Sequence, residues 1–168
     1  DVGVPAPMSA LVFNTRRPLF ADRRVREALT LVFDFEWLNK TLFRSLYART
    51  ESFFDRSELS SHGRPADARE RELLAPFASE VLPGIMEGEF GQPVTDGSGT
   101  NREGRKRAIA LLEEAGYELR DGVMTSKATG RPFTFEMLCA THEQERLMLA
   151  YSRFLRQIGI TAQVRLID

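Results

Sequence analysis

Cys139 and His142 are the two residues of this sequence that come nearest to a nucleophilic pair. An imidazole beside a thiol can lower the thiol pKa and so create a nucleophile. However, Cys139 ends an apolar run and His142 falls in the first turn of an expected helix, so a structural role is the simpler interpretation. His62 is the only other histidine, and neither histidine has the spacing of a metal site or a triad. We therefore expect no enzyme, no metal site and no cofactor.

Two pairs of carboxylates and one glycine-rich stretch also contain residue types that could take part in chemistry. Glu113 with Glu114, and Glu87 with Glu89, could serve as acid and base, but nothing around them predicts burial, so solvated surface is expected. The stretch DGSGTNREG at 96–104 runs into a helix start, where free amides favour anions. It lacks the Lys-Ser/Thr pair of a phosphate loop, so a plain loop with an Asn cap is favoured.

The stretch FNTRRPLFADRRVREAL at 13–29 contains five arginines. One interpretation is a small nucleic-acid or anion-binding module that uses residues 16–26, from Arg16 to Arg26. The chain as a whole has 23 Lys and Arg against 24 Asp and Glu, whereas a nucleic-acid domain usually has a clear basic excess. The other interpretation is an amphipathic helix with arginines on its solvent face, including a weak Arg23–Glu27 pair.

Regular elements must position these residues, and their ends are marked by capping residues. Helix starts are predicted at Asp22, Asp34, Asp67, Asn101 and Thr141. The second of these helices is predicted to end near Arg49, and the run SALVFN at 9–14 favours a strand. No apolar run approaches the roughly 20 residues that span a bilayer. Because the first residue is Asp1, we expect the chain to begin inside a longer gene product.

The C-terminal third has the most regular pattern. Apolar residues alternate over 133–137 and again over 160–166, with a long amphipathic helix between them. Two strands joined by a helix are expected to pair in parallel through a right-handed crossover. Asp121 and Gly122 suit the tight turn of a hairpin. The sequence therefore predicts a mixed α/β fold.

Three motifs in order give a family resemblance. They are a helix start with Phe20, Asp22, Val25, Arg26 and Ala28, a helix end LLEEAGY at 111–117, and an Ile-Gly-Ile joint at 158–160 before the last strand. Together they resemble the family 5 extracellular solute-binding proteins, the peptide receptors of bacterial ABC importers. RTESFFDRSEL at 49–59 and PVTDGSGTNR at 93–102 further resemble the YejA-like branch, which is associated with oligopeptide and microcin C uptake.

The resemblance implies a fold and a role. Residues 1–168 would form a single α/β lobe, the second of the two lobes of a type II periplasmic binding protein, with a mixed β-sheet flanked by helices. The first lobe and the segment after Asp168 lie outside this sequence. Such a receptor is periplasmic, binds oligopeptides in the cleft between its lobes, and delivers them to the ABC permease of the inner membrane. No nucleic-acid partner is expected.

The loop at 49–59 is expected to face that cleft, because it is polar, irregular and carries two adjacent phenylalanines that a core cannot easily use. The expected ligand-binding residues are Arg49, Thr50, Ser52, Phe53, Phe54, Arg56 and Glu58. Arg49 or Arg56 could pair with a ligand carboxylate. The alternatives are that the phenylalanines pin the loop as a minor cluster and that the arginines are simply solvated.

Overall fold

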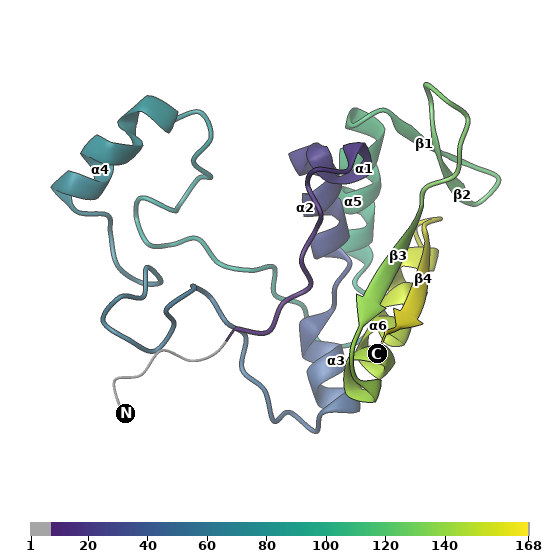
Figure 1. Ribbon diagram of the computed structural model, residues 1–168, viewed down its shortest axis with the longest axis horizontal. Coiled ribbons are helices and arrows are strands. Elements are labelled where there is room, and N and C mark those ends of the chain that lie inside the picture. Colours follow the sequence, from purple (N-terminus) through teal and green to yellow (C-terminus); the bar gives the residue numbers. More distant parts are fainter. Residues whose placement is uncertain (1–7, 168) are drawn as a thin grey trace. The chain divides into compact units, whose positions relative to one another are not determined.

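A computed structural model describes residues 8–167, and the chain forms two compact units (Figure 1). Of the described chain, the loop unit comprises residues 8–11 and 48–92, and the core unit comprises residues 12–47 and 93–167. Nearly all of the regular structure belongs to the core unit. The assignment of residues 1–168 to one lobe of a larger receptor stays a prediction.

Helices α1 (Pro18–Ala21), α2 (Arg23–Leu31), α3 (Phe35–Leu42) and α5 (Arg102–Glu114) begin the core unit. The predicted caps are confirmed, because the side chains of Asp22, Asp34 and Asn101 each accept a hydrogen bond from a backbone amide in the first turn. The apolar stripe of α2 is buried, and α2 packs side by side with α5 (Figure 1). Val25, Ala28 and Leu29 are each at most 1% exposed.

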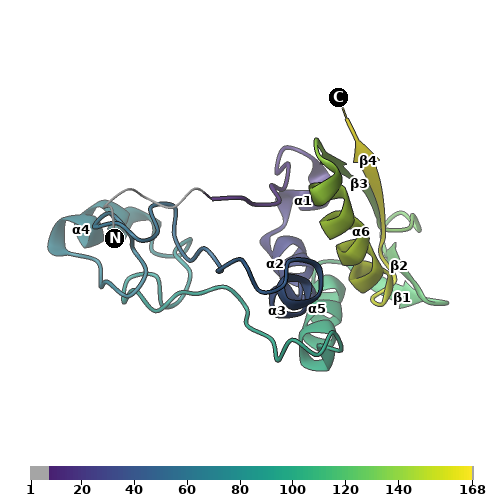
Figure 2. The same ribbon diagram turned by 90° about the horizontal axis from the view of Figure 1, so that it is seen from below.

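The predicted strand–helix–strand unit is confirmed. Strands β3 (Thr134–Cys139) and β4 (Thr161–Leu166) pair in parallel, with Phe135 opposite Ala162, and α6 (His142–Arg156) connects them. Figure 2 shows α6 lying along one face of this two-stranded sheet. The buried phenol of Tyr151 on α6 donates to the backbone carbonyl of Leu29 at 2.7 Å, which ties the unit to α2.

The hairpin of β1 (Tyr117–Arg120) and β2 (Val123–Ser126) also follows the sequence prediction. Asp121 and Gly122 both have positive φ angles, 51° and 80°, as a tight two-residue turn between twisted strands requires. At α6, Thr141 caps the helix as predicted, but the side chain of Gln144 reaches the amide of Ala140 instead of that of Thr141.

Two element predictions are wrong. Residues 9–14 are not a strand, because no described strand lies beside them to pair with their backbone groups. Helix α3 ends at Leu42, well before Arg49. Arg44 and Ser45 have φ angles of 53° and 60°, so the chain turns into the left-handed region, where an α-helix cannot continue.

A strap, defined here as residues 93–100, is bound to the start of α3. The carboxylate of Asp34, which is 1% exposed, accepts hydrogen bonds from the Trp37 amide, the Thr95 hydroxyl and the Gly99 amide. Gly99 has a φ of +76°, and a Cβ there would lie 2.8 Å from the indole of Trp37. Glycine is therefore required for the strap to pass this close to the ring.

The loop unit has a different construction. It contains α4 (Ala68–Leu74) and the short 3-10 helix η1 (Ala75–Phe77), and the predicted cap Asp67 forms a capping box with Glu70. Among its described residues no apolar side chain is buried. Backbone bonds hold it instead, including Gly63 N–H to Gly88 O at 2.9 Å and Ala66 N–H to Met86 O at 2.8 Å.

Candidate ligand-binding site

The expected ligand-binding loop lies in the loop unit, and its two aromatic rings are exposed. The side chains of Phe53 and Phe54 are 79% and 50% exposed, and neither ring packs on another ring in the described chain. The alternative in which they pin the loop as a small cluster is therefore disfavoured. The segment is shaped by its own polar groups, since the Glu51 amide donates to Asp55 and the Gln92 amide donates to Glu51.

The other expected site residues are placed differently from one another. Ser52 is buried, and its hydroxyl lies 2.9 Å from that of Ser60, so it is not presented to solvent. Arg49 and Thr50 are half-buried, whereas Arg56 and Glu58 are exposed. The structure thus presents the two phenylalanines, one arginine and one glutamate on the surface of this loop.

The core unit contains a hollow of about 470 Å³ between the end of α3 and the first turn of α6. Its lining residues are Leu42, Phe43, Arg44, Leu46, Tyr47, His142, Glu143 and Arg146. The Tyr47 phenol donates to the Glu143 carboxylate at 3.0 Å, and the rings of Phe43 and Tyr47 meet edge to face at 5.0 Å. Two guanidinium groups and one carboxylate beside aromatic walls can receive an anionic group together with apolar surface.

Sequence reasoning missed this hollow because it placed the end of the helix too late. The left-handed residues Arg44 and Ser45 are not glycines, so the turn has no compositional signal. A partial signal exists in Asn39, because Asn side chains often bind nearby backbone groups at turns.

The Cys139–His142 pair does not form. The Cys139 thiol is buried and contacts the carbonyl of Arg165, while Nδ1 of His142 lies 3.0 Å from Glu145. Burial, with the nearby Glu145 charge, raises the pKa of the Cys139 thiol, which is the opposite of what a nucleophile needs. Within residues 8–167, no three His, Cys, Asp or Glu side chains gather as a metal site requires.

The remaining chemical candidates have structural roles or are solvated. Glu113, Glu114, Glu87 and Glu89 are all exposed, as expected. The backbone amides of residues 97–100 each donate to a side-chain oxygen of the chain itself. Those oxygens belong to Thr95, Asp96, Asp34 and Ser98. The amides of residues 97–100 are therefore already bonded within the chain, and the expected Asn cap is confirmed, because the Asn101 side chain accepts from the Gly104 amide.

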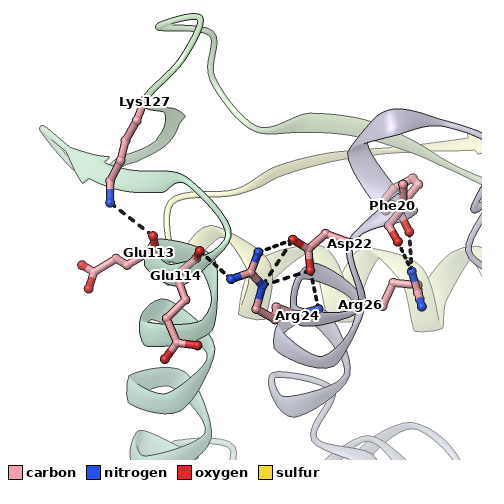
Figure 3. A network of polar contacts seen from close by, with 8 residues as sticks. Phe20, Asp22, Arg24, Arg26, Glu113, Glu114 and Lys127 are labelled. Carbon is pink, nitrogen blue, oxygen red and sulfur yellow. Dashed lines mark hydrogen bonds and ion pairs between the residues drawn. The ribbon is translucent and has the colours of Figure 1, made fainter. Parts of the chain in front are cut away.

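The basic stretch 16–26 uses two of its arginines inside the core unit (Figure 3). Arg24 bridges the Asp22 carboxylate at 2.6 Å and the carbonyl of Glu114 at 2.7 Å, and Arg26 donates to the carbonyl of Phe20 at 2.7 Å. Cations are favourable at helix C-termini, where carbonyls lack partners. In the described chain the expected Arg23–Glu27 pair does not form.

The capping role accounts for this stretch better than an anion-binding surface does. Lys127 adds a second cation at the end of α5, where its Nζ donates to the carbonyl of Glu113 at 3.2 Å (Figure 3). Arg24 and Arg26 are thereby committed to carbonyls at the ends of α5 and α1. Arg16, Arg17, Arg23 and Arg24 are all exposed, but Arg24 is held by Asp22 and by the carbonyl of Glu114.

The core unit is an α/β fold that contains a parallel strand–helix–strand unit, and the loop unit presents the exposed rings of Phe53 and Phe54. The family comparison identifies the class. The model of the bacterial extracellular solute-binding proteins, family 5 (middle region), matches residues 3–168. The chain therefore belongs to that family, whose members are binding proteins.

Relatives in sequence cover the whole chain. A protein of Brucella melitensis is 53% identical over 168 residues, which are 100% of this chain and 27% of that protein. The peptidoglycan-binding protein YepA of Agrobacterium fabrum is 42% identical over 98% of this chain and 27% of its own length. YejA of Escherichia coli is 39% identical over 94% of this chain and 26% of its own length. The chain thus spans about a quarter of the length of these relatives.

Solved structures share the fold. An oligopeptide-binding protein of Thermotoga maritima with bound mannohexaose matches with a TM-score of 0.66 at 14% identity, over 98% of this chain and 26% of that one. NikZ of Campylobacter jejuni, in complex with Ni(L-His), matches with a TM-score of 0.63 at 20% identity, over 92% of this chain and 24% of NikZ. AppA of Bacillus subtilis, in complex with a nonapeptide, matches with a TM-score of 0.58 at 20% identity, over 93% of this chain and 25% of AppA. These are type II periplasmic binding proteins, and their three ligands differ in chemistry.

None of the described helices of this chain is both long and apolar enough to cross a membrane.

Proposed function

We propose that this chain is part of the substrate-binding component of a bacterial ABC importer. It forms the second lobe of a periplasmic receptor, takes oligopeptides into the cleft between two lobes, and delivers them to the permease of the inner membrane. The observation that carries this proposal is the match to the solute-binding family over residues 3–168. Receptors of this kind close around a ligand by hinge motion.

The ligand class is supported by the relatives at higher identity. YepA is named as peptidoglycan-binding, and a second Agrobacterium fabrum protein, 40% identical over 161 residues, is named "Probable peptide-binding protein YejA". Peptidoglycan contains short peptide stems, so one ligand chemistry, a peptide main chain with a free carboxylate, agrees with both names. The solved structures share only the fold with this chain, so their ligands do not indicate its ligand class.

Two surfaces of the chain suit such a ligand. On the loop, Phe53 and Phe54 supply exposed aromatic surface that a peptide can cover, with Arg56 near them in sequence. In the hollow, Arg44 and Arg146 can receive a carboxylate, and the Phe43 and Tyr47 rings supply apolar walls. Each surface belongs to its own unit and is proposed on its own geometry.

The test is equilibrium binding by calorimetry with the full-length protein. The probes are tetra-alanine and a peptidoglycan stem tetrapeptide. Full burial of a phenylalanine side chain contributes about 1.5–3 kcal/mol, so Phe53→Ala and Phe54→Ala are each expected to weaken binding roughly 10–100-fold. Phe77→Ala is the matched control, because Phe77 is 59% exposed in the same unit but lies outside the loop.

Two results would contradict the proposal. If neither probe binds the wild-type protein more tightly than about 1 mM, the peptide class is wrong. If both probes bind but Phe53→Ala and Phe54→Ala behave like Phe77→Ala, the loop does not contact the ligand. In that case the receptor assignment stands without these site residues.

A further inference from the structure

The turn that follows α3 is held in an unfavourable backbone conformation. Arg44 and Ser45 are consecutive residues with φ angles of 53° and 60°, in a region that residues with a Cβ seldom adopt. Such residues persist only when surrounding contacts fix them, and they concentrate at functional sites.

Asn39 supplies the contacts. Its side-chain Nδ2 donates to the backbone carbonyl of Tyr47 at 2.7 Å, and its Oδ1 accepts from the backbone amide of Tyr47 at 3.1 Å. The backbone carbonyl of Asn39 also accepts from the Ser45 amide at 3.0 Å. One residue on α3 therefore closes the turn from both sides.

The closed turn places the ring of Tyr47 in the hollow. The ring packs edge to face on Phe43, and its hydroxyl donates to Glu143 on the first turn of α6 at 3.0 Å. Within the described chain, Tyr47 is thus the residue of the turn that donates a hydrogen bond across to α6. The shape of the hollow depends on where this residue is held.

We propose that Asn39 is a positioning residue of the hollow, which fixes the strained turn and so sets Tyr47 against Glu143. The inference rests on the proposed function, in which the hollow receives part of the ligand. Asn39 itself is not among the residues that line the hollow, so its effect on binding would pass through Tyr47.

The titration of Tyr47 reports this position directly. The hydrogen bond to Glu143, with the charge of that carboxylate, raises the pKa of the Tyr47 phenol. The other charged or titratable groups that line the hollow are Arg44, His142 and Arg146, and His142 is bonded to Glu145. In Asn39→Ala the turn is expected to open, and the pKa of Tyr47 is expected to fall back toward about 10.

A matched control exists at Asn101. Its side chain also donates to one carbonyl, that of Leu31 at 2.8 Å, and accepts from one amide, that of Gly104 at 3.0 Å. Asn101→Ala removes the same number of side-chain hydrogen bonds, so it is expected to lower stability comparably and to leave Tyr47 unchanged. Adding Ser45→Gly to Asn39→Ala relieves the backbone strain and is expected to restore the Tyr47 titration in part.

The experiment is a pH titration of the full-length protein labelled with ¹³Cζ-tyrosine, with Tyr47→Phe used to assign the signal. Peptide affinity is measured in parallel and is expected to weaken about tenfold in Asn39→Ala relative to Asn101→Ala. Unchanged Tyr47 titration in Asn39→Ala overturns the positioning role. A shifted titration with unchanged affinity overturns the role of the hollow in binding, while peptide binding by the wild-type protein tests the receptor assignment separately.

Discussion

Replacing Asp34 tests whether one buried carboxylate joins the strap to α3. Its oxygens accept from the Trp37 amide, the Thr95 hydroxyl and the Gly99 amide, and the residue is 1% exposed. A hydrogen bond to a charged group contributes about 1.5–3 kcal/mol net. The three bonds share one acceptor and are not additive, so Asp34→Ala is expected to lower the free energy of unfolding by about 3–5 kcal/mol.

Asp34→Asn separates the charge from the shape. The amide keeps one acceptor oxygen for Trp37 and Thr95 but turns an NH₂ group toward the Gly99 amide, so a loss of about 1.5–3 kcal/mol is expected. Asp22→Asn is the control, because Asp22 caps α2 in the same way but its side chain is 33% exposed. The exposed ion pair of Asp22 with Arg24 and the helix cap together contribute about 1 kcal/mol to the free energy of unfolding.

The assay is urea unfolding followed by tryptophan fluorescence. Trp37 is the only tryptophan of the chain, and its ring contacts both Gly99 and Phe154, so it reports release of the strap as well as unfolding. The slope of the unfolding free energy against urea concentration should stay the same as in the wild type if the variant changes stability alone. If Asp34→Asn costs no more than Asp22→Asn, the strap is not held by this carboxylate and the reasoning is refuted.

Two further outcomes are expected. Tyr151→Phe removes the hydroxyl that donates to the buried carbonyl of Leu29 at 2.7 Å. The free energy of unfolding should therefore fall by about 1–3 kcal/mol. An unchanged urea midpoint would contradict this expectation. The Arg24 hydrogen bond lowers the pKa of Asp22, so its contribution is present above the unfolded pKa near 4 and is lost as pH falls through the lower folded value. Stability measured from pH 5 to 2 should therefore fall less steeply in Asp22→Asn than in the wild type.

Local signals in the sequence were sufficient for most of the regular elements. A capping residue satisfies amides that lie two or three positions ahead of it, so Asp22, Asp34 and Asn101 could be recognised without knowledge of the rest of the chain. The alternation over 133–137 and 160–166 likewise gave the buried face of each strand, because side chains on a strand point to alternate sides. The parallel pairing followed from the helix between the strands.

The site was less accessible to sequence reasoning, because it depends on contacts between distant residues. No residue near Tyr47 in sequence indicates that Glu143 is its hydrogen-bond partner. The left-handed turn at Arg44 and Ser45 contains no glycine that would predict it. The loop residues Phe53 and Phe54 could be named from composition, but only the structure shows that both rings are exposed.

The sequence by itself determined where most helices and strands begin, which faces are apolar, and which family the motifs resemble, because these properties depend on short-range spacing. Only the tertiary structure decided what the polar side chains do. The sequence alone indicates that Arg24 is a solvated helix residue, but the fold brings the carbonyl of Glu114 at the end of α5 within reach of its guanidinium. The sequence likewise indicates that Asp34 is only a helix cap, but in the fold it also binds the Gly99 amide of the strap. Hydrogen bonds depend on distance in space, and the folding of the chain sets that distance.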